Sequence, residues 1–361
     1  MENEREVLLS VKNLQQYFKM GKRELKAVDN VSFDIYKGEV FGLVGESGCG
    51  KTTTGRSIIR LYDITGGSVY YKGQRICAGT RSYKDAIKQA RKDYAAGVIT
   101  KEELDEIVAV NKAEITSAVR DHNSFSRVKG NNKITNEIQM IFQDPISSLD
   151  PRMTVRDIIA EGLIIRGIKD KEYIDQQVYK ILETVGLVQE HASRYPHEFS
   201  GGQRQRIGIA RAVVMNPELI IADEPISALD VSIQAQVINL LNDLSKEMGL
   251  TIMFIAHDLA VVKYFSNRIA VMYFGKIVEL GTSDELFAHP FHPYTRSLLS
   301  AIPLPDPITE KSRKRMEYNP VLDHDYSMEG PTLQEVYPGH FVLCNTEDFE
   351  KYKKQYEESK N

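Results

Sequence analysis

Continuous apolar runs mark three places along the chain. The runs at Val40–Val44, Leu219–Ala222 and Thr251–Ala256 predict strands that are buried on both faces, as in a parallel sheet. Val231–Met248, between the last two runs, has a helical pattern, so this stretch is expected to form a strand, helix, strand unit. Strand composition also marks three stretches near the N-terminus, Val7–Val11, Ala27–Ile35 and Gly66–Gly73. The pattern therefore predicts an α/β fold.

Apolar positions at helical spacing predict a charged helical hairpin at residues 81–130. Gly97 interrupts the pattern, and Thr100–Glu103 resembles a capping box at the start of the second helix. The apolar positions of the first helix are Tyr83, Ile87, Ala90 and Tyr94. Residues 121–135, rich in Asn, Ser, Lys and Gly, are expected to be a flexible return. Two more helices are expected around Val155–Ile165 and Tyr173–Val185.

Composition narrows the class of protein. The 361 residues are 42% hydrophobic, which is enough for a sizeable core, and the net charge of −4 provides no global basic field for nucleic acid. No run approaches the ~18 apolar residues of a membrane span. The acidic start, Met1–Glu6, lacks the apolar run of a signal peptide, and the three cysteines lie far apart. These features predict a protein of the cytosol.

The sharpest motif is a P-loop. Gly45-Glu46-Ser47-Gly48-Cys49-Gly50-Lys51-Thr52 fits the pattern G-x-x-x-x-G-K-[ST], with a predicted strand before it and a predicted helix after it. Glycines let the backbone wrap a triphosphate, and the helix N-terminus favours an anion. Lys51 is expected to reach the β- and γ-phosphates of ATP, and the Thr52 hydroxyl to bind Mg²⁺. An ordinary glycine-rich turn is the alternative, which this context disfavours.

Two carboxylates end the apolar run Leu219–Ala222. Asp223 is expected to help hold Mg²⁺, and Glu224 to polarise the attacking water. A pair of solvated acids at a strand end is the alternative. Further along, Phe199-Ser200-Gly201-Gly202-Gln203 predicts a second helix start that could bind an anion, or a plain serine N-cap. Two phosphate-type helix starts in one chain suggest that two subunits sandwich the nucleotide.

At this point the chain resembles the ATP-binding subunits of ABC transporters. Phe199–Gln203 is similar to the signature motif of that family, with Phe199 where leucine is commoner, and Ser227–Asp230 is similar to the D-loop. By this resemblance Gln143 contacts Mg²⁺ and relays to membrane subunits, and His257 senses the γ-phosphate. The adenine is expected to stack on Phe18 or Tyr17, of which Phe18 fits the spacing better.

The resemblance implies a set of site residues. Catalytic roles fall to Glu224, His257 and Gln143, and Mg²⁺ ligands to Thr52, Gln143 and Asp223. Nucleotide contacts are expected from Phe18, Gly45, Glu46, Ser47, Gly48, Cys49, Gly50, Lys51, Thr52, Thr53, Gln143, Ser200, Gly201, Gly202, Gln203 and Asp230. The implied fold is an ABC-type P-loop NTPase with a RecA-like core, an antiparallel β subdomain, an α-helical signature subdomain and a C-terminal extension.

A narrower resemblance points to oligopeptide and dipeptide importer ATPases, closest to the F type. The segment 144–155 after Gln143, the run 289–296 and the later 338–341 carry it. It implies a nucleotide-binding domain at 1–283, with the helical insertion at about 81–130 and a helical subdomain at about 150–213, and an extension at 284–361. Nickel importers share much of this pattern, and a soluble ABC-type ATPase acting on DNA or ribosomes is a further alternative.

The same resemblance implies partners and a location. They are a second, homologous ATPase subunit in a heterodimer, two membrane permeases and, indirectly, an extracytoplasmic peptide-binding protein, at the cytoplasmic face of the cell membrane. No nucleic acid is expected as a partner.

The chain departs from the family in the spacing of two motifs. Lys51 and Gln143 are 92 positions apart, about twice the spacing of the family, and the predicted hairpin accounts for the surplus.

The cysteines carry two further expectations. Some relatives bind an iron–sulfur cluster through C-terminal cysteines, but only Cys344 lies in that region and a cluster needs about four thiolates, so no cluster is expected. Cys49 lies in the phosphate loop, where Lys51 and a helix N-terminus are expected to favour a reactive thiolate.

Overall fold

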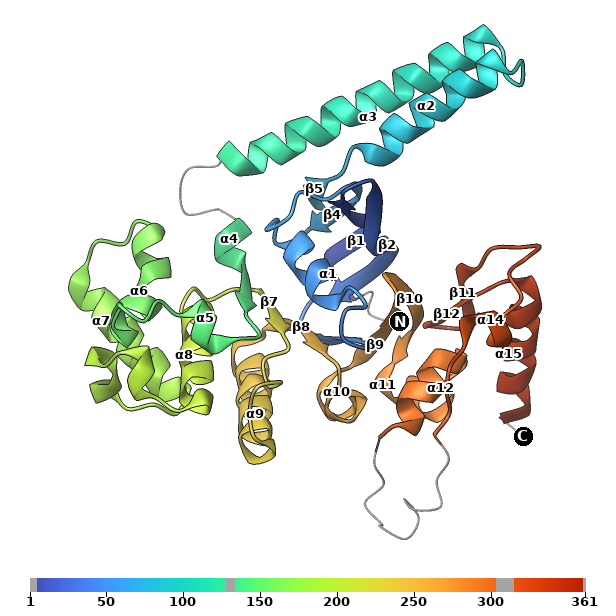
Figure 1. Ribbon diagram of the computed structural model, residues 1–361. Coiled ribbons are helices and arrows are strands. Elements are labelled where there is room, and N and C mark those ends of the chain that lie inside the picture. Colours follow the sequence, from blue (N-terminus) through green and yellow to red (C-terminus); the bar gives the residue numbers. More distant parts are fainter. Residues whose placement is uncertain (1–4, 128–133, 303–314, 360–361) are drawn as a thin grey trace.

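A computed structural model describes residues 5–127, 134–302 and 315–359, and within them two sheets organise the fold (Figure 1). The smaller sheet is antiparallel, in the order β2-β1-β4-β5. Its strands are β1 (Val7–Met20), β2 (Arg23–Tyr36), β4 (Gly66–Tyr71) and β5 (Gln74–Ala78). β1 and β2 run well beyond the predicted stretches because their outer halves pair with each other as a ribbon.

The larger sheet has the strand order β11-β12-β10-β9-β3-β8-β7-β6. Its strands from β9 to β6 are parallel, whereas β10, β12 and β11 add to it antiparallel. The bounds are β3 (Val40–Val44), β6 (Ile138–Ile141), β7 (Leu219–Asp223), β8 (Thr251–Ala256), β9 (Arg268–Tyr273), β10 (Lys276–Thr282), β11 (Thr332–Tyr337) and β12 (His340–Cys344). The three apolar runs of the sequence are thus neighbouring parallel strands.

Two hydrophobic clusters cover the two faces of this sheet. Alternate residues of β8, such as Phe254 and Ile255, belong to different clusters, so each face is buried. One cluster includes the small sheet and α1 (Lys51–Ile58). The other continues into the helices at the left of Figure 1. The core therefore joins the parallel sheet to both subdomains.

The helices fall into groups around the sheets (Figure 1). The left-hand group contains α4 (Ile134–Glu137), α5 (Pro145–Ser148), α6 (Val155–Ile165), α7 (Lys171–Thr184), α8 (Gly201–Val213) and the short 3₁₀ turns Gln189–Ser193 and Pro196–Glu198. Below the sheet lie α9 (Val231–Met248), α10 (Leu259–Phe265), α11 (Ser283–Ala288) and α12 (Pro293–Ser300). Beside the strands β11 and β12 lie α14 (Pro320–Asp323) and α15 (Thr346–Ser359).

The predicted hairpin consists of α2 (Arg81–Ala95) and α3 (Lys101–Arg127), which extend away from the sheets (Figure 1). The predicted capping box is present, since Thr100 N–H donates to the Glu103 carboxylate and Glu103 N–H to the Thr100 hydroxyl. The expectation of a flexible return at 121–135 was wrong for 121–127 and 134–135, because α3 continues through Arg127 and α4 begins at Ile134. Residues 128–133 lie outside the described residues.

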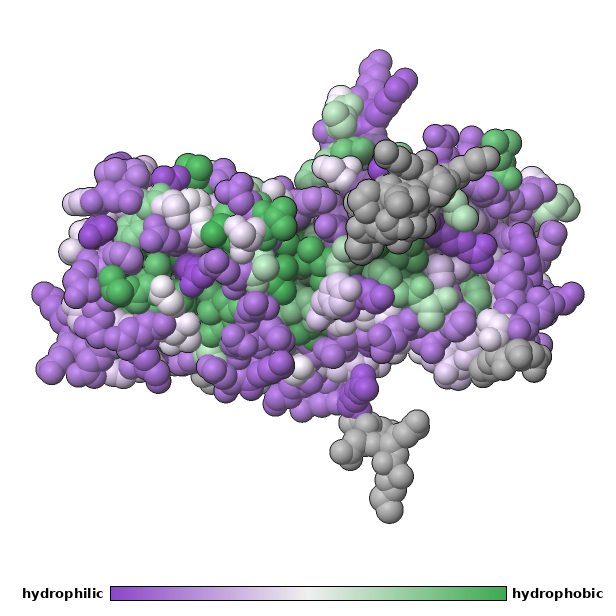
Figure 2. Space-filling view, turned by 90° about the horizontal axis from the view of Figure 1, so that it is seen from below, coloured by the Kyte–Doolittle hydropathy of each residue, from purple (hydrophilic) through white to green (hydrophobic). Residues whose placement is uncertain are grey.

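Among the described residues, none of the helices combines the length and the apolar character that a membrane crossing requires. Figure 2, a view from below, shows hydrophobic residues gathered in a band across the middle of that face, with polar residues around them. The observed architecture confirms the expected fold class: an α/β core with an antiparallel β subdomain, a helical subdomain and a C-terminal extension.

Candidate active site

The candidate site lies where four parallel strands end together. β3, β8, β7 and β6 are adjacent and in register at their carboxyl ends, where Val44 pairs with Ala256 and Ile141 with Ala222. Residues that directly follow these strands therefore meet at one edge of the sheet, which is the usual place for a ligand in an open α/β sheet. Gly45, Glu224 and His257 directly follow β3, β7 and β8, and Gln143 is the second residue after β6.

The P-loop depends on its glycines. Gly45, Gly48 and Gly50 have φ values of 153°, 82° and 114°, a region that other residues rarely adopt. A Cβ at Gly50 would lie 2.2 Å from the carbonyl oxygen of Ala27, so the loop has no room for a side chain there. α1 begins at Lys51, and its first N–H groups have no partner within the helix, which is an arrangement that binds phosphate.

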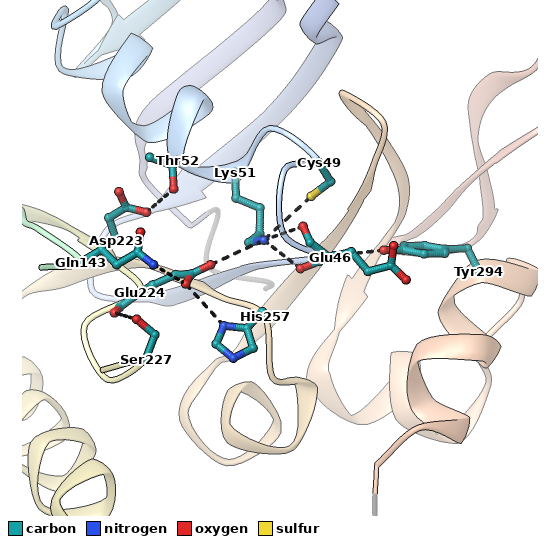
Figure 3. Close-up of polar contacts among 11 residues, drawn as sticks. Glu46, Cys49, Lys51, Thr52, Gln143, Asp223, Glu224, Ser227, His257 and Tyr294 are labelled. Carbon is teal, nitrogen blue, oxygen red and sulfur yellow. Dashed lines mark hydrogen bonds and ion pairs between the residues drawn. The ribbon is translucent and has the colours of Figure 1, made fainter. Parts of the chain in front are cut away.

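Lys51 is held inside this loop. Its side chain is 3% exposed, and Nζ donates to the carbonyl oxygens of Gly45 at 2.8 Å and Glu46 at 2.9 Å. The same nitrogen lies 3.7 Å from Oε1 of Glu224 (Figure 3). The ammonium group thus joins the P-loop to the end of β7.

Thr52 and Asp223 form an oxygen pair that suits a hard cation. The Thr52 hydroxyl donates to Oδ1 of Asp223 at 2.7 Å, and Asp223 is fully buried. Its Oδ2 has no hydrogen-bond partner among the described residues, although Arg56 lies 3.9 Å away. Burial raises the pKa of the Asp223 carboxyl, and the Thr52 hydrogen bond opposes that shift. Mg²⁺ prefers such oxygens and takes its other ligands from water and phosphate, so these residues fit it.

Glu224 is the centre of the polar contacts in Figure 3. Oε2 accepts a hydrogen bond from the Gln143 amide at 3.0 Å and lies 3.4 Å from Nδ1 of His257. The Ser227 hydroxyl donates to the Glu224 carbonyl oxygen at 3.1 Å. Glu224 has a φ of 43°, an uncommon value for a residue with a side chain, and strain of this kind gathers at functional sites. Four predicted residues, Lys51, Gln143, Glu224 and His257, are therefore brought together.

An open cavity of about 440 Å³ adjoins this group. Its lining includes Ser47 of the P-loop, Gln143 and His257. The cavity lies beside the Glu224 carboxylate, which also lines it. The arrangement can therefore place a phosphate near both a fixed ammonium and a carboxylate, which is what phosphoryl transfer to water requires.

The predicted signature residues lie elsewhere in the chain's fold. Ser200 caps α8 through a capping box: its hydroxyl accepts from Gln203 N–H, and the Gln203 side chain accepts from Ser200 N–H. α8 belongs to the left-hand helical group of Figure 1, apart from the P-loop. Gly202 packs on α9, since a Cβ there would lie 2.6 Å from Cγ2 of Ile233. Asp230 is the N-cap residue of α9, without a side-chain cap bond.

The candidate adenine residues lie on β1. Phe18 packs edge-on against Tyr62, with ring centroids 5.4 Å apart. Tyr17 is held by other contacts, because its hydroxyl donates to Asp29 and Arg81 stacks on its ring. Neither ring belongs to the polar group around Glu224. Thr53 is half-buried in the first turn of α1.

The expected thiolate at Cys49 was wrong in direction. Cys49 is 7% exposed, and this burial raises the pKa of its thiol, although the nearby Lys51 ammonium lowers it. The charge of Lys51 is visible in the sequence, whereas the burial of Cys49 depends on the fold. Cys49 is therefore a small buried residue that fits the loop.

Tyr294 is a residue of this neighbourhood that the sequence did not assign. Its hydroxyl accepts a hydrogen bond from the Glu46 N–H of the P-loop at 3.1 Å (Figure 3). Arg56, close to Asp223, was also missed. Residues 289–296 carry part of the family resemblance, but nothing in them indicates a contact between Tyr294 and a residue 248 positions away.

Comparison with known proteins agrees with this geometry. Residues 28–106 and 104–227 match the model of the ABC transporter family, and residues 278–326 match the C-terminal region of oligopeptide/dipeptide transporters. The oligopeptide transport ATP-binding protein OppF of Bacillus subtilis is 53% identical over 96% of this chain and 99% of its own. The dipeptide transport ATP-binding protein DppF of Lactococcus lactis is 47% identical over 96% and 97%.

The fold is also similar to that of a solved structure. An ATP-binding cassette, determined as a dimer in a post-hydrolysis state bound to ADP and Pi, matches with a TM-score of 0.56 and 26% identity over 76% of this chain and 99% of that one. The family match, the near full-length identities and the P-loop fold agree. This chain belongs to the ABC transporter family, as one of its ATP-hydrolysing subunits.

Proposed function

We propose that this chain hydrolyses ATP to drive the import of oligopeptides or dipeptides through membrane permeases. The observation that carries the proposal is the meeting of Lys51, Gln143, Glu224 and His257 at one sheet edge. Near full-length relatives named for oligopeptide and dipeptide transport support the cargo class over nickel. The division into a cassette at 1–283 and an extension at 284–361 is part of the proposal.

The P-loop binds the triphosphate in this proposal. Its backbone N–H groups, with Lys51, neutralise the β- and γ-phosphates, and Ser47, Gly48 and Thr53 lie beside them on the loop and first turn. Phe18 stacks on the adenine. Thr52, Asp223 and Gln143 hold Mg²⁺, which neutralises phosphate charge when it is bound.

Glu224 orients the attacking water and accepts its proton as the water oxygen bonds to the γ-phosphorus and the bond from that phosphorus to the bridging oxygen breaks, which releases ADP and inorganic phosphate. The contacts of its Oε2 with Gln143 and His257 aim the carboxylate toward the cavity beside Ser47. His257 responds to the γ-phosphate from the end of β8. Each residue therefore acts from the end of a different strand.

A second, homologous subunit completes the site in this proposal. The residues of the second subunit that correspond to Ser200–Gln203 contact the phosphates bound by this chain. Ser200–Gln203 of this chain contact the phosphates bound by the second subunit in the same way. Val231, next to Asp230 at the start of α9, is 82% exposed, which suits a residue that a partner covers. The solved relative that matches this fold is itself a dimer.

Permease subunits contact the segment after Gln143, at the cytoplasmic face of the membrane. Ile146, on the short helix α5, is 65% exposed, and an apolar side chain at that position suits a partner surface. A peptide-binding protein outside the cell delivers the cargo.

Purification of the tagged full-length chain from its own cells should recover two membrane permeases and a second cassette. Ribosomes or DNA in their place would overturn the transport role.

Replacing the carboxylate tests the catalytic assignment directly. Glu224→Gln keeps the shape but removes the proton acceptor, so ATP turnover should fall on the order of a hundredfold or more, while ATP-dependent dimers accumulate in size-exclusion chromatography. Asp258→Asn, next to His257 but exposed and outside these contacts, is the matched control. Turnover of Glu224→Gln at the rate of the unchanged protein would refute the role.

A further inference from the structure

The phenol of Tyr294 contacts the P-loop from the C-terminal extension. Tyr294 lies on α12 and is 2% exposed, and its hydroxyl oxygen accepts from the Glu46 N–H at 3.1 Å. The Glu46 carbonyl oxygen in turn accepts from Lys51 Nζ at 2.9 Å. Residue 46 is therefore held at both ends, by the extension on one side and by the phosphate-binding lysine on the other (Figure 3).

A buried carboxylate fixes the segment that carries Tyr294. Glu279 of β10 is fully buried, and it accepts hydrogen bonds from the N–H groups of Phe291 at 2.8 Å and His292 at 3.1 Å. Its Oε1 also lies 2.8 Å from Nε2 of His340 on β12. Glu279 thus ties the start of α12 to a strand of the main sheet.

The next link is His292. Its Nδ1 accepts from the Tyr294 N–H at 3.1 Å and caps α12, and its side chain is almost fully buried. At the other side of the turn Arg296 donates to the carbonyl oxygen of Pro290 and to the side chain of Gln355 on α15. Hydrogen bonds that are buried at Glu279 and His292 and partly buried at Arg296 therefore hold the segment that carries Tyr294 to the main sheet and to α15.

We propose that Tyr294 is a positioning residue for ATP binding: it fixes the Glu46 peptide, and through it the place of Lys51 in the P-loop. The inference rests on the proposed role of residues 45–52 in holding the triphosphate. Tyr294 touches neither the phosphates nor the water, so we expect its loss to weaken ATP binding more than it slows the chemical step. The C-terminal extension thereby sets the affinity of the nucleotide site.

The test uses the full-length chain and trinitrophenyl-ATP as a fluorescent probe. Tyr294→Phe removes only the hydroxyl, and the Kd for the probe and the KM for ATP should rise about five- to tenfold, with kcat within twofold. Tyr318→Phe is the matched control. The ring centroids of Tyr318 and Tyr294 are 5.6 Å apart, and among the described residues the Tyr318 hydroxyl makes no hydrogen bond to the P-loop. Its Kd should stay within twofold.

A double-mutant cycle identifies the hydrogen bond itself. Glu46→Pro removes the N–H group that donates to the Tyr294 hydroxyl. Adding Tyr294→Phe to that variant should therefore cause no further change in the Kd for the probe. An unchanged Kd in Tyr294→Phe alone, or an effect that persists with Glu46→Pro, would overturn the proposal. Lys51→Ala separates the two ideas: if that variant still binds the probe normally, the proposed phosphate site fails whatever Tyr294 does.

Discussion

Two additions to the cassette, the hairpin α2–α3 and the C-terminal extension, are joined to it in opposite ways. The hairpin extends from the small sheet (Figure 1), and its charged contacts include Arg75 with Asp121 and Arg81 with Glu24, all with partly exposed partners. The extension adds β12 to the main sheet and buries Glu279 completely.

The difference shows which addition is joined firmly to the parts of the chain around the candidate site. Partly exposed ion pairs contribute about 0–1 kcal/mol each, so a hairpin held by them can change with little effect on the cassette. A buried carboxylate is costly unless every lone pair has a donor, and breaking such a set is strongly destabilising. The extension is attached through such a buried carboxylate, Glu279, and it contacts the P-loop through Tyr294.

The largest expected effect comes from the buried carboxylate. Glu279→Ala leaves the N–H groups of Phe291 and His292 and the ring of His340 without their acceptor, which should lower the free energy of unfolding by about 3–5 kcal/mol. Chemical denaturation with urea measures it, and Glu279→Gln should lose less because an acceptor oxygen remains. A loss below about 1 kcal/mol would show that the extension is attached as loosely as the hairpin.

An intermediate effect depends on pH. Burial, with the nearby His324 and Arg296, lowers the pKa of His292 to about 3 from its usual 6.5. His292 is then neutral in the folded protein, whereas the unfolded chain binds a proton below pH 6.5, so stability falls as pH drops from 6.5 toward 3. Between pH 7 and 5 this loss should be about 2 kcal/mol.

His292→Asn isolates that contribution. Asn keeps a side-chain acceptor for the Tyr294 N–H but does not titrate, so the variant should lose about 2 kcal/mol less than the unchanged protein between the two pH values. Urea unfolding of both proteins at pH 7 and pH 5 provides the comparison. Parallel pH curves would mean that His292 takes up a proton in the folded state.

The smallest effect is expected at the base of the hairpin. Arg75→Ala removes hydrogen bonds to Asp121 and Ser117 and should cost about 1 kcal/mol of stability, with ATP turnover within twofold of normal. Thermal unfolding and steady-state ATPase assays check both values. A large loss of turnover would place the hairpin in the catalytic machinery and remove the contrast with the extension.

Much of the site could be predicted from the sequence, because its parts are local. Glu224 and His257 directly follow the apolar strands β7 and β8, and Lys51 ends the loop that follows β3. Parallel strands bring their carboxyl ends to one edge of the sheet. The antiparallel subdomain and the helical hairpin were likewise visible as patterns. Their spacing in the sequence predicts that these residues lie near one another. Individual contacts, such as the hydrogen bond from Gln143 to Glu224, become visible only in the folded structure.

The misses have a common physical cause, which is burial and contact between distant parts of the chain. Burial outweighs the charge of Lys51 at Cys49, so the expected thiolate was wrong. Tyr294 reaches Glu46 only because β10 and β12 bring the extension beside the P-loop. α3 continues through Arg127 where a composition rich in polar residues had suggested a loop.

The close contact between Gly202 and Ile233 constrains how this chain can evolve. A Cβ at position 202 would lie 2.6 Å from the Ile233 side chain, and Gly202 has an ordinary backbone conformation, so space alone excludes a larger residue. Mutations at the two positions are then order-dependent: alanine at 202 becomes tolerable only after position 233 has lost its branch. α8 and α9 are therefore expected to vary together at these two positions among descendants of this protein.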